Sequence, residues 1–83
     1  MITVYVLKGH TGKRYVGITN NLSRRIKEHQ NKNSKGGQIL GDFYLLHIEE
    51  FPDYENARKR EIFLKSGQGR KWLDMLESQS SPS

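Results

Sequence analysis

The chain has 83 residues, a formal net charge of +5 and no cysteine, which allows one domain with a thin core and excludes disulfides and cysteine-ligated metal or redox sites. No apolar run approaches the roughly 20 residues that a membrane-spanning helix needs, and the N-terminus becomes polar too early for a secretory signal. We therefore expect a cytoplasmic protein with no membrane partner. The excess of Lys and Arg favours nucleic acid as the partner.

Two β-strands are predicted at the N-terminus. Residues 2–8 and 13–19 are rich in β-branched and aromatic side chains, and the turn-forming residues 9–12 separate them. The two strands should pair as an antiparallel hairpin. With the turn centred near its middle, Tyr5 and Tyr15 lie opposite each other or nearly so, and both point to one face of the sheet.

A short helix and a third strand follow the hairpin. Asn20 and Asn21 are good helix caps, and a helix over residues 22–30 places Leu22, Ile26 and His29 or Gln30 on one stripe. Residues 31–40 are polar and contain glycine, which predicts a loop. Residues 43–51 are almost continuously apolar at first, as in a strand that is covered on both faces.

Two further helices are predicted near the C-terminus. Asp53 is the expected N-cap of the first helix, and Gly67 is its expected end. Residues 70–76 form the second helix. The serine-rich residues 78–83 are expected to be a disordered tail, so the single domain is expected to span residues 1–77.

The predicted order of elements is therefore β-β-α-β-α-α. This order indicates an α/β (α+β) fold in which helices flank a small, mainly antiparallel three-stranded sheet.

Arg25 and His29 are the first candidates for chemistry. They lie four residues apart on one helix, so their side chains stand on the same face. A guanidinium offers a planar fork to phosphate oxygens, and an imidazole exchanges a proton near neutral pH. The alternative is a solvated helix face, which is the usual role of a run of charges.

The strand tyrosines and Gly17 form a second group of candidates. A strand tyrosine is more often a core residue than a catalyst, but a phenol near cations or a metal-bound water can lose its proton and act as a general base. A glycine inside a strand often marks the close approach of another backbone or a ligand.

Glu61 is the third candidate, because it lies on the inward stripe of its helix. A carboxylate there needs a partner or a metal ion, and Mg²⁺ binds readily through one carboxylate, waters and phosphate oxygens. The alternative is a salt bridge to Lys65, four residues further along the helix.

The combined pattern resembles the GIY-YIG nuclease family. Tyr5 stands in the first strand, Tyr15-Val16-Gly17 in the second, and Arg25 and His29 follow at the family's spacing, with Glu61 on a later helix. Residues 49–73 are similar to small stand-alone bacterial members, which resemble the N-terminal nuclease domain of an excision-repair protein. The resemblance covers roughly residues 2–76.

The resemblance implies a metal-dependent endonuclease that hydrolyses phosphodiester bonds of DNA. Tyr15 would be the general base or orient the attacking water, and Tyr5 would support it at the scissile phosphate. Arg25 would stabilise developing charge, and His29 would assist proton transfer or bind phosphate. Glu61 would be the single protein ligand of one Mg²⁺ or Mn²⁺ ion.

Substrate binding is expected from Gly17 and from four cations. These cations are Lys13, Arg14, Arg24 and Lys65. A chain of this length leaves no room for a separate recognition domain, which favours structure-selective cutting, a role in DNA repair or recombination, or service in a larger repair complex.

Two other functions remain open at this point. One is a nucleic-acid-binding module that does not cleave. The other is an interaction domain that uses the aromatic surface near Phe43, Tyr44 and Trp72.

Overall fold

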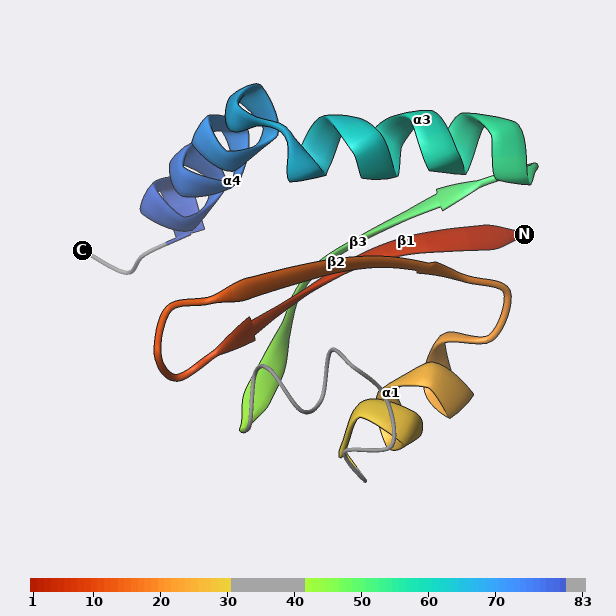
Figure 1. Ribbon diagram of the computed structural model, residues 1–83, viewed down its shortest axis with the longest axis horizontal. Coiled ribbons are helices and arrows are strands. Elements are labelled where there is room, and N and C mark those ends of the chain that lie inside the picture. Colours follow the sequence, from red (N-terminus) through yellow and green to blue (C-terminus); the bar gives the residue numbers. More distant parts are fainter. Residues whose placement is uncertain (31–41, 81–83) are drawn as a thin grey trace.

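The computed structural model describes residues 1–30 and 42–80 (Figure 1). The predicted loop at residues 31–40 lies outside the described residues. The described elements, in chain order, are β1 (Ile2–Gly9), β2 (Arg14–Thr19), α1 (Leu22–Gln30), β3 (Phe43–Phe51), α3 (Tyr54–Lys65) and α4 (Gly67–Ser80). This arrangement confirms the predicted α+β fold and the order β-β-α-β-α-α.

The three described strands form one antiparallel sheet in the order β2-β1-β3. In the hairpin, Tyr5 pairs with Gly17 and Leu7 pairs with Tyr15. Tyr5 and Tyr15 therefore share a face of the sheet, as predicted, but they are offset by two residues instead of being directly opposed. The offset arises because the turn closes with a hydrogen bond from Gly9 N–H to the Lys13 carbonyl, which centres the turn on Thr11.

Helices cover the sheet on both faces, with α1 on one side and with α3 and α4 on the other (Figure 1). The α3/α4 side holds an apolar core, whose buried members are Ile2, Val4, Val6, Val16, Ala57, Leu64 and Leu73. The α1 side has a smaller cluster around Tyr5 and Leu7. Because β1 is the central strand, it is the one buried on both faces.

The prediction that the third strand is covered on both faces is wrong. Tyr44, Leu45 and Ile48 on β3 are each more than 40% exposed, at 49%, 42% and 44%. The reason is sheet order, since β3 is an edge strand and pairs with β1 alone among the described strands. An apolar run does not by itself show whether a strand is central or at an edge.

The C-terminal helices differ from the prediction at their junction. Asp53 is confirmed as the N-cap of α3, because its side chain accepts a hydrogen bond from Asn56 N–H at 2.9 Å. However, α3 ends before Ser66, and Gly67 opens α4 instead of ending α3. A Cβ at Gly69 would lie well under 3.0 Å from the Phe63 carbonyl, so this glycine lets α4 pack directly against the last turn of α3.

Helix α4 is also longer than predicted. It continues to Ser80, so three residues of the expected tail are helical, and residues 81–83 lie outside the described part of the chain. Acidic side chains on α4 form ion pairs with the hairpin, which gives these last turns a tertiary partner that periodicity does not reveal. None of the described helices is long and apolar enough to cross a membrane.

Candidate active site

The Tyr5 hydroxyl group is the centre of a buried polar cluster on the α1 face. The Tyr5 side chain is fully buried, and its Oη shares a hydrogen bond of 3.0 Å with His29 Nε2. Arg25 Nε donates a second hydrogen bond to the same oxygen at 3.3 Å. The two helix residues predicted to share a face therefore meet on one phenol from the central strand.

Gly17 makes this arrangement possible. It is the strand partner of Tyr5, and a Cβ at this position would lie well under 3.0 Å from the Tyr5 ring and hydroxyl oxygen. The predicted close approach to Gly17 is thus made by an aromatic side chain of the protein itself. A larger residue at position 17 would displace Tyr5 from the centre of the cluster.

Aromatic packing joins Tyr15 to the same cluster. The Tyr15 and His29 rings meet edge to face with their centroids 5.0 Å apart, and the Tyr5 and Tyr15 centroids are 6.3 Å apart. Phe43 packs against His29 at 6.0 Å. Tyr15 is only partly buried, so it is the tyrosine of the pair that reaches the protein surface.

Burial sets the protonation states of the cluster. Desolvation raises the pKa of Tyr5 above its ordinary value of 10.0, although the hydrogen bond from Arg25 opposes the shift. Burial, together with the nearby charge of Arg25, lowers the pKa of His29 below 6.5. At neutral pH, Tyr5 is therefore a neutral phenol and His29 a neutral imidazole.

Arg25 connects the buried cluster to the surface. Its Nη1 lies 3.3 Å from Glu28 Oε2, and a third of its side chain is exposed. Arg24, further out on the same helix, pairs with the other oxygen of Glu28 at 3.5 Å and is 65% exposed. Arg25 can therefore offer part of its guanidinium outward while Tyr5 holds its Nε edge.

Glu61 lies on the other side of the sheet, on α3. Its side chain is nearly buried, and Oε2 pairs with Lys65 Nζ at 3.2 Å, so the salt bridge considered from the sequence is present. The described residues contain no group of three or more His, Asp and Glu side chains that could hold a metal ion. A cation on Glu61 would therefore complete its shell with water and substrate oxygens, as Mg²⁺ commonly does.

The five predicted catalytic residues are thus divided between the two faces. Tyr5, Tyr15, Arg25 and His29 lie together under α1, whereas Glu61 projects from α3, which packs against β1 and β2. Strand β2 pairs with β1 alone among the described strands, so its outer edge separates the two groups. Because Tyr15 lies on β2 and α3 packs against β2, a ligand lying across this edge could touch both groups.

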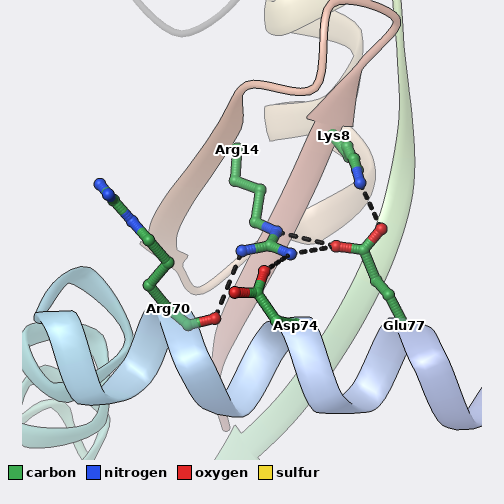
Figure 2. Close-up of polar contacts among 5 residues, drawn as sticks. All are labelled: Lys8, Arg14, Arg70, Asp74 and Glu77. Carbon is green, nitrogen blue, oxygen red and sulfur yellow. Dashed lines mark hydrogen bonds and ion pairs between the residues drawn. The ribbon is translucent and has the colours of Figure 1, made fainter.

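The cations expected to bind substrate have different surroundings. Lys13 is exposed in the turn, whereas the side chain of Arg14 is only 16% exposed and is engaged by α4. Arg14 donates to Glu77 through Nε at 2.9 Å and to Asp74 through Nη2 at 2.6 Å (Figure 2). Most of the hydrogen-bonding capacity of Arg14 is therefore used inside the protein.

The sequence interpretation missed the partners of Arg14. Asp74 and Glu77 stand three residues apart, so they project from the same face of α4, and Glu77 also binds Lys8 (Figure 2). Two acids on one face of a helix in a basic chain were the available signal. Only the tertiary structure shows which basic residues they meet.

The sequence as a whole matches a known family of catalytic domains. The family model of the GIY-YIG catalytic domain matches residues 1–73. The chain belongs to the GIY-YIG catalytic domain family. This membership confirms the family resemblance inferred from the sequence.

Relatives of this chain include small proteins named UPF0213. One from Clostridium perfringens is 35% identical over 78 residues, which cover 93% of this chain and 84% of the relative. One from Autographa californica nuclear polyhedrosis virus is 42% identical over 75% of this chain, but the chain spans only 62% of that relative's length.

A solved structure supports the same fold. The solution NMR structure of a UPF0213 protein from Bacillus halodurans is 34% identical, with a TM-score of 0.57, and the match covers 92% of this chain and 85% of the other. This chain therefore shares its fold with a small protein that it matches over most of the length of both chains.

Proposed function

We propose that this protein is a metal-dependent endonuclease that hydrolyses phosphodiester bonds of DNA at the edge of β2. The observation that carries the proposal is the division of the site, with a buried phenol–imidazole–guanidinium cluster on one face and a nearly buried carboxylate on the other. A phosphodiester lying across the edge strand would meet both groups.

Glu61 fits the role of a single protein ligand to one Mg²⁺ or Mn²⁺ ion. Its carboxylate is held on an inward helix stripe, and its ionic partner, Lys65, has a side chain that is 56% exposed and can swing away. When bound, the metal would polarise a phosphoryl oxygen and favour departure of the 3′-oxygen. Lys65 would then be available to a neighbouring phosphate.

Tyr15 is proposed to orient or deprotonate the attacking water. Its ring is fixed edge-on against His29, and it is the tyrosine with access to the surface. The neutral imidazole of His29 is in the state that accepts a proton. Arg25 would donate to the phosphoryl oxygens as negative charge develops on them.

Tyr5 is assigned a positioning role. The expectation from the family resemblance is that Tyr5 supports Tyr15 at the scissile phosphate, and the full burial of its side chain favours indirect support through its neighbours. Tyr5 holds Nε of Arg25 and Nε2 of His29 on one oxygen. This hydrogen bonding fixes the geometry of Arg25, which reaches the surface, and of His29, which packs against the ring of Tyr15.

The biological role is proposed to be structure-selective cleavage in DNA repair or recombination in the cytoplasm, alone or in a larger repair complex. The supporting observations are the small size of the domain and its basic charge. A single sharp cleavage site on a long random duplex would contradict structure selectivity.

The test is a cleavage assay on flaps, junctions, single strands and duplexes with Mg²⁺ and Mn²⁺. Glu61→Ala and Tyr15→Phe should each lower the rate by at least about 10²-fold, the typical contribution of a positioned acid–base or electrostatic group. Glu55→Ala, an exposed acid on the same helix, should leave the rate unchanged. If the parent protein leaves all substrates intact with both metals, the proposal fails.

A binding module that does not cleave is the second candidate. The observation in its favour is the Glu61–Lys65 ion pair, which neutralises the proposed metal ligand. This candidate predicts salt-sensitive DNA binding that Arg25→Ala weakens and Glu61→Ala leaves intact, with no cleavage by the parent protein.

A further inference from the structure

A pocket of about 690 Å³ opens between the turn of the hairpin and the two C-terminal helices. Residues of β1, β2, α3 and α4 contribute to its walls, and Tyr15 belongs to its lining. Lys65, the ionic partner of Glu61, also lines it. The pocket therefore adjoins both halves of the proposed active site.

The lining of the pocket is strongly cationic. Five of the lining residues carry a positive charge, and they are Lys8, Lys13, Arg14, Lys65 and Arg70. Asp74 is the single acidic residue of the lining. A concave surface with this balance concentrates phosphate groups, because the low-dielectric walls focus the field.

Two of these cations have no ionic partner in the part of the chain that the structure describes. Lys8 and Arg14 are engaged by Glu77 and Asp74, whereas neither Lys13 nor Arg70 forms a salt bridge within those residues. In Figure 2, the Arg70 side chain points away from this cluster, and only its carbonyl oxygen accepts from Arg14, at 3.5 Å. The guanidinium of Arg70 is therefore available to a ligand.

The pocket also has an apolar wall. Val16, Leu64 and Leu73 line its floor and are 7%, 2% and 1% exposed, and the partly buried ring of Tyr15 adds a more accessible apolar surface. Cations around apolar side chains match the chemistry of a nucleotide, which combines an anionic phosphate with an apolar sugar and base. A site for phosphate alone would not need the apolar wall.

We infer that this pocket holds the nucleotide that flanks the scissile phosphate, with its phosphate group on Lys13 and Arg70. This inference rests on the proposed function and names the substrate class. In an intact duplex the bases are stacked and paired, so an apolar wall inside a pocket is accessible only to an unpaired nucleotide. The preferred substrate is therefore DNA with an unpaired nucleotide beside the cut, as in a flap, a gap or a frayed end.

The experiment is an NMR titration of the ¹⁵N-labelled full chain in EDTA, with a 5′-phosphorylated thymidine trinucleotide as the probe. We expect the largest amide shifts at Lys13, Val16 and Leu64. Arg70→Ala should weaken binding about three- to tenfold, as expected for the loss of one charge-assisted phosphate contact at a partly open site. The Arg70 carbonyl that supports Arg14 is retained in this variant.

Lys71→Ala is the matched control. Lys71 is the next residue on α4, is exposed, and does not line the pocket. Its replacement removes the same charge and should change the dissociation constant by less than about twofold. In cleavage assays, Arg70→Ala should raise KM for a flap while leaving kcat unchanged, and it should have no effect beyond that of Lys71→Ala on a fully paired duplex.

Three results would overturn the inference. Equal losses for Arg70→Ala and Lys71→Ala would indicate general electrostatic attraction. Equal shifts with inorganic phosphate or an acidic peptide would show that the pocket does not recognise a nucleotide. Amide shifts confined to α1 would show that the trinucleotide binds outside this pocket. The binding arm contains no metal and needs no turnover, so it tests the pocket even if the parent protein fails to cleave.

Discussion

The two faces of the sheet are stabilised in different ways. Under α1, the interior is polar and aromatic, and one fully buried phenol organises an imidazole and a guanidinium. Under α3 and α4, the interior is mainly apolar, with Glu61 as a nearly buried charge and with other ion pairs at the margins. At the margin of the α3/α4 side, the guanidinium carbon of Arg60 lies 4.8 Å from the ring centroid of Phe63 and 4.7 Å from that of Trp72. Arg60 also pairs with Glu49.

This difference indicates a division of labour between stability and chemistry. An apolar interior gains free energy from burial alone, while a buried polar cluster gains little net stability and requires each partner to be present. We therefore expect substitutions of the apolar residues on the α3/α4 side, as distinct from Glu61, to change mainly the free energy of unfolding. Substitutions on the α1 side should change activity more than stability.

The largest expected effect on stability is that of Leu73→Ala on the α3/α4 side. Leu73 is 1% exposed, and its loss leaves a cavity that should cost about 2–5 kcal/mol of unfolding free energy. Chemical denaturation measures this change. Met75→Ala on the same helix, where Met75 is 60% exposed, should stay within about 0.5 kcal/mol. A large loss of cleavage per folded molecule in Leu73→Ala would contradict the view that the apolar interior under α3 and α4 serves stability alone.

Gly17→Ala should have the next largest effect. The new methyl group overlaps the Tyr5 ring, and such overpacking costs about 1–3 kcal/mol. Cleavage should fall as well, because Tyr5 can no longer hold Arg25 and His29. The control is Gly67→Ala at the start of α4, where a Cβ meets nothing within 4 Å. Unchanged stability and cleavage in Gly17→Ala would refute this account of Gly17.

Tyr5→Phe and Tyr15→Phe sharpen the comparison within one face. Removing the buried Tyr5 hydroxyl takes this partner from His29 Nε2, which should cost about 1–3 kcal/mol. Removing the hydroxyl of the partly exposed Tyr15 should lower stability less than Tyr5→Phe does, but it should lower the cleavage rate more. Denaturation and single-turnover cleavage of both variants give the two rankings. If Tyr15→Phe were the less stable and more active variant, the assigned roles would be reversed.

The smallest expected effect is on the pH dependence of stability, because a group on each face should lose its contribution over a different pH range. The pKa of His29 lies below 6.5 when folded, so the unfolded chain takes up a proton first, and stability falls as the pH drops below about 6.5. Burial pushes the pKa of Glu77 upward, but hydrogen bonds from Lys8 and Arg14 outweigh it and hold the pKa below 4.5. Its contribution is present above that pH and is lost as the pH falls further.

Two variants test these windows. His29→Gln should flatten the decrease in stability just below pH 6.5, and Glu77→Gln should flatten the decrease below pH 4.5, each by about 1 kcal/mol or less. Denaturation midpoints across this pH range provide the measurement. A single window that both variants abolish would show that the two faces do not titrate independently.

Much of the architecture could be predicted from the sequence. The hairpin, the Asp53 cap and the order of elements follow from local patterns, since β-branched runs, capping side chains and helical periodicity act over a few residues. The exposed edge of β3 and the early start of α4 could not be predicted. They depend on sheet order and on how closely Gly69 lets two helices meet.

The candidate site shows the same limit. Sequence spacing placed Arg25 and His29 on one helix face and Glu61 on an inward stripe, because the period of a helix sets both relations. Only the tertiary structure shows that Tyr5 is buried between Arg25 and His29 and that Glu61 lies across the sheet. Strand order and long-range packing join residues that are far apart in the chain, and local periodicity contains no information about such contacts.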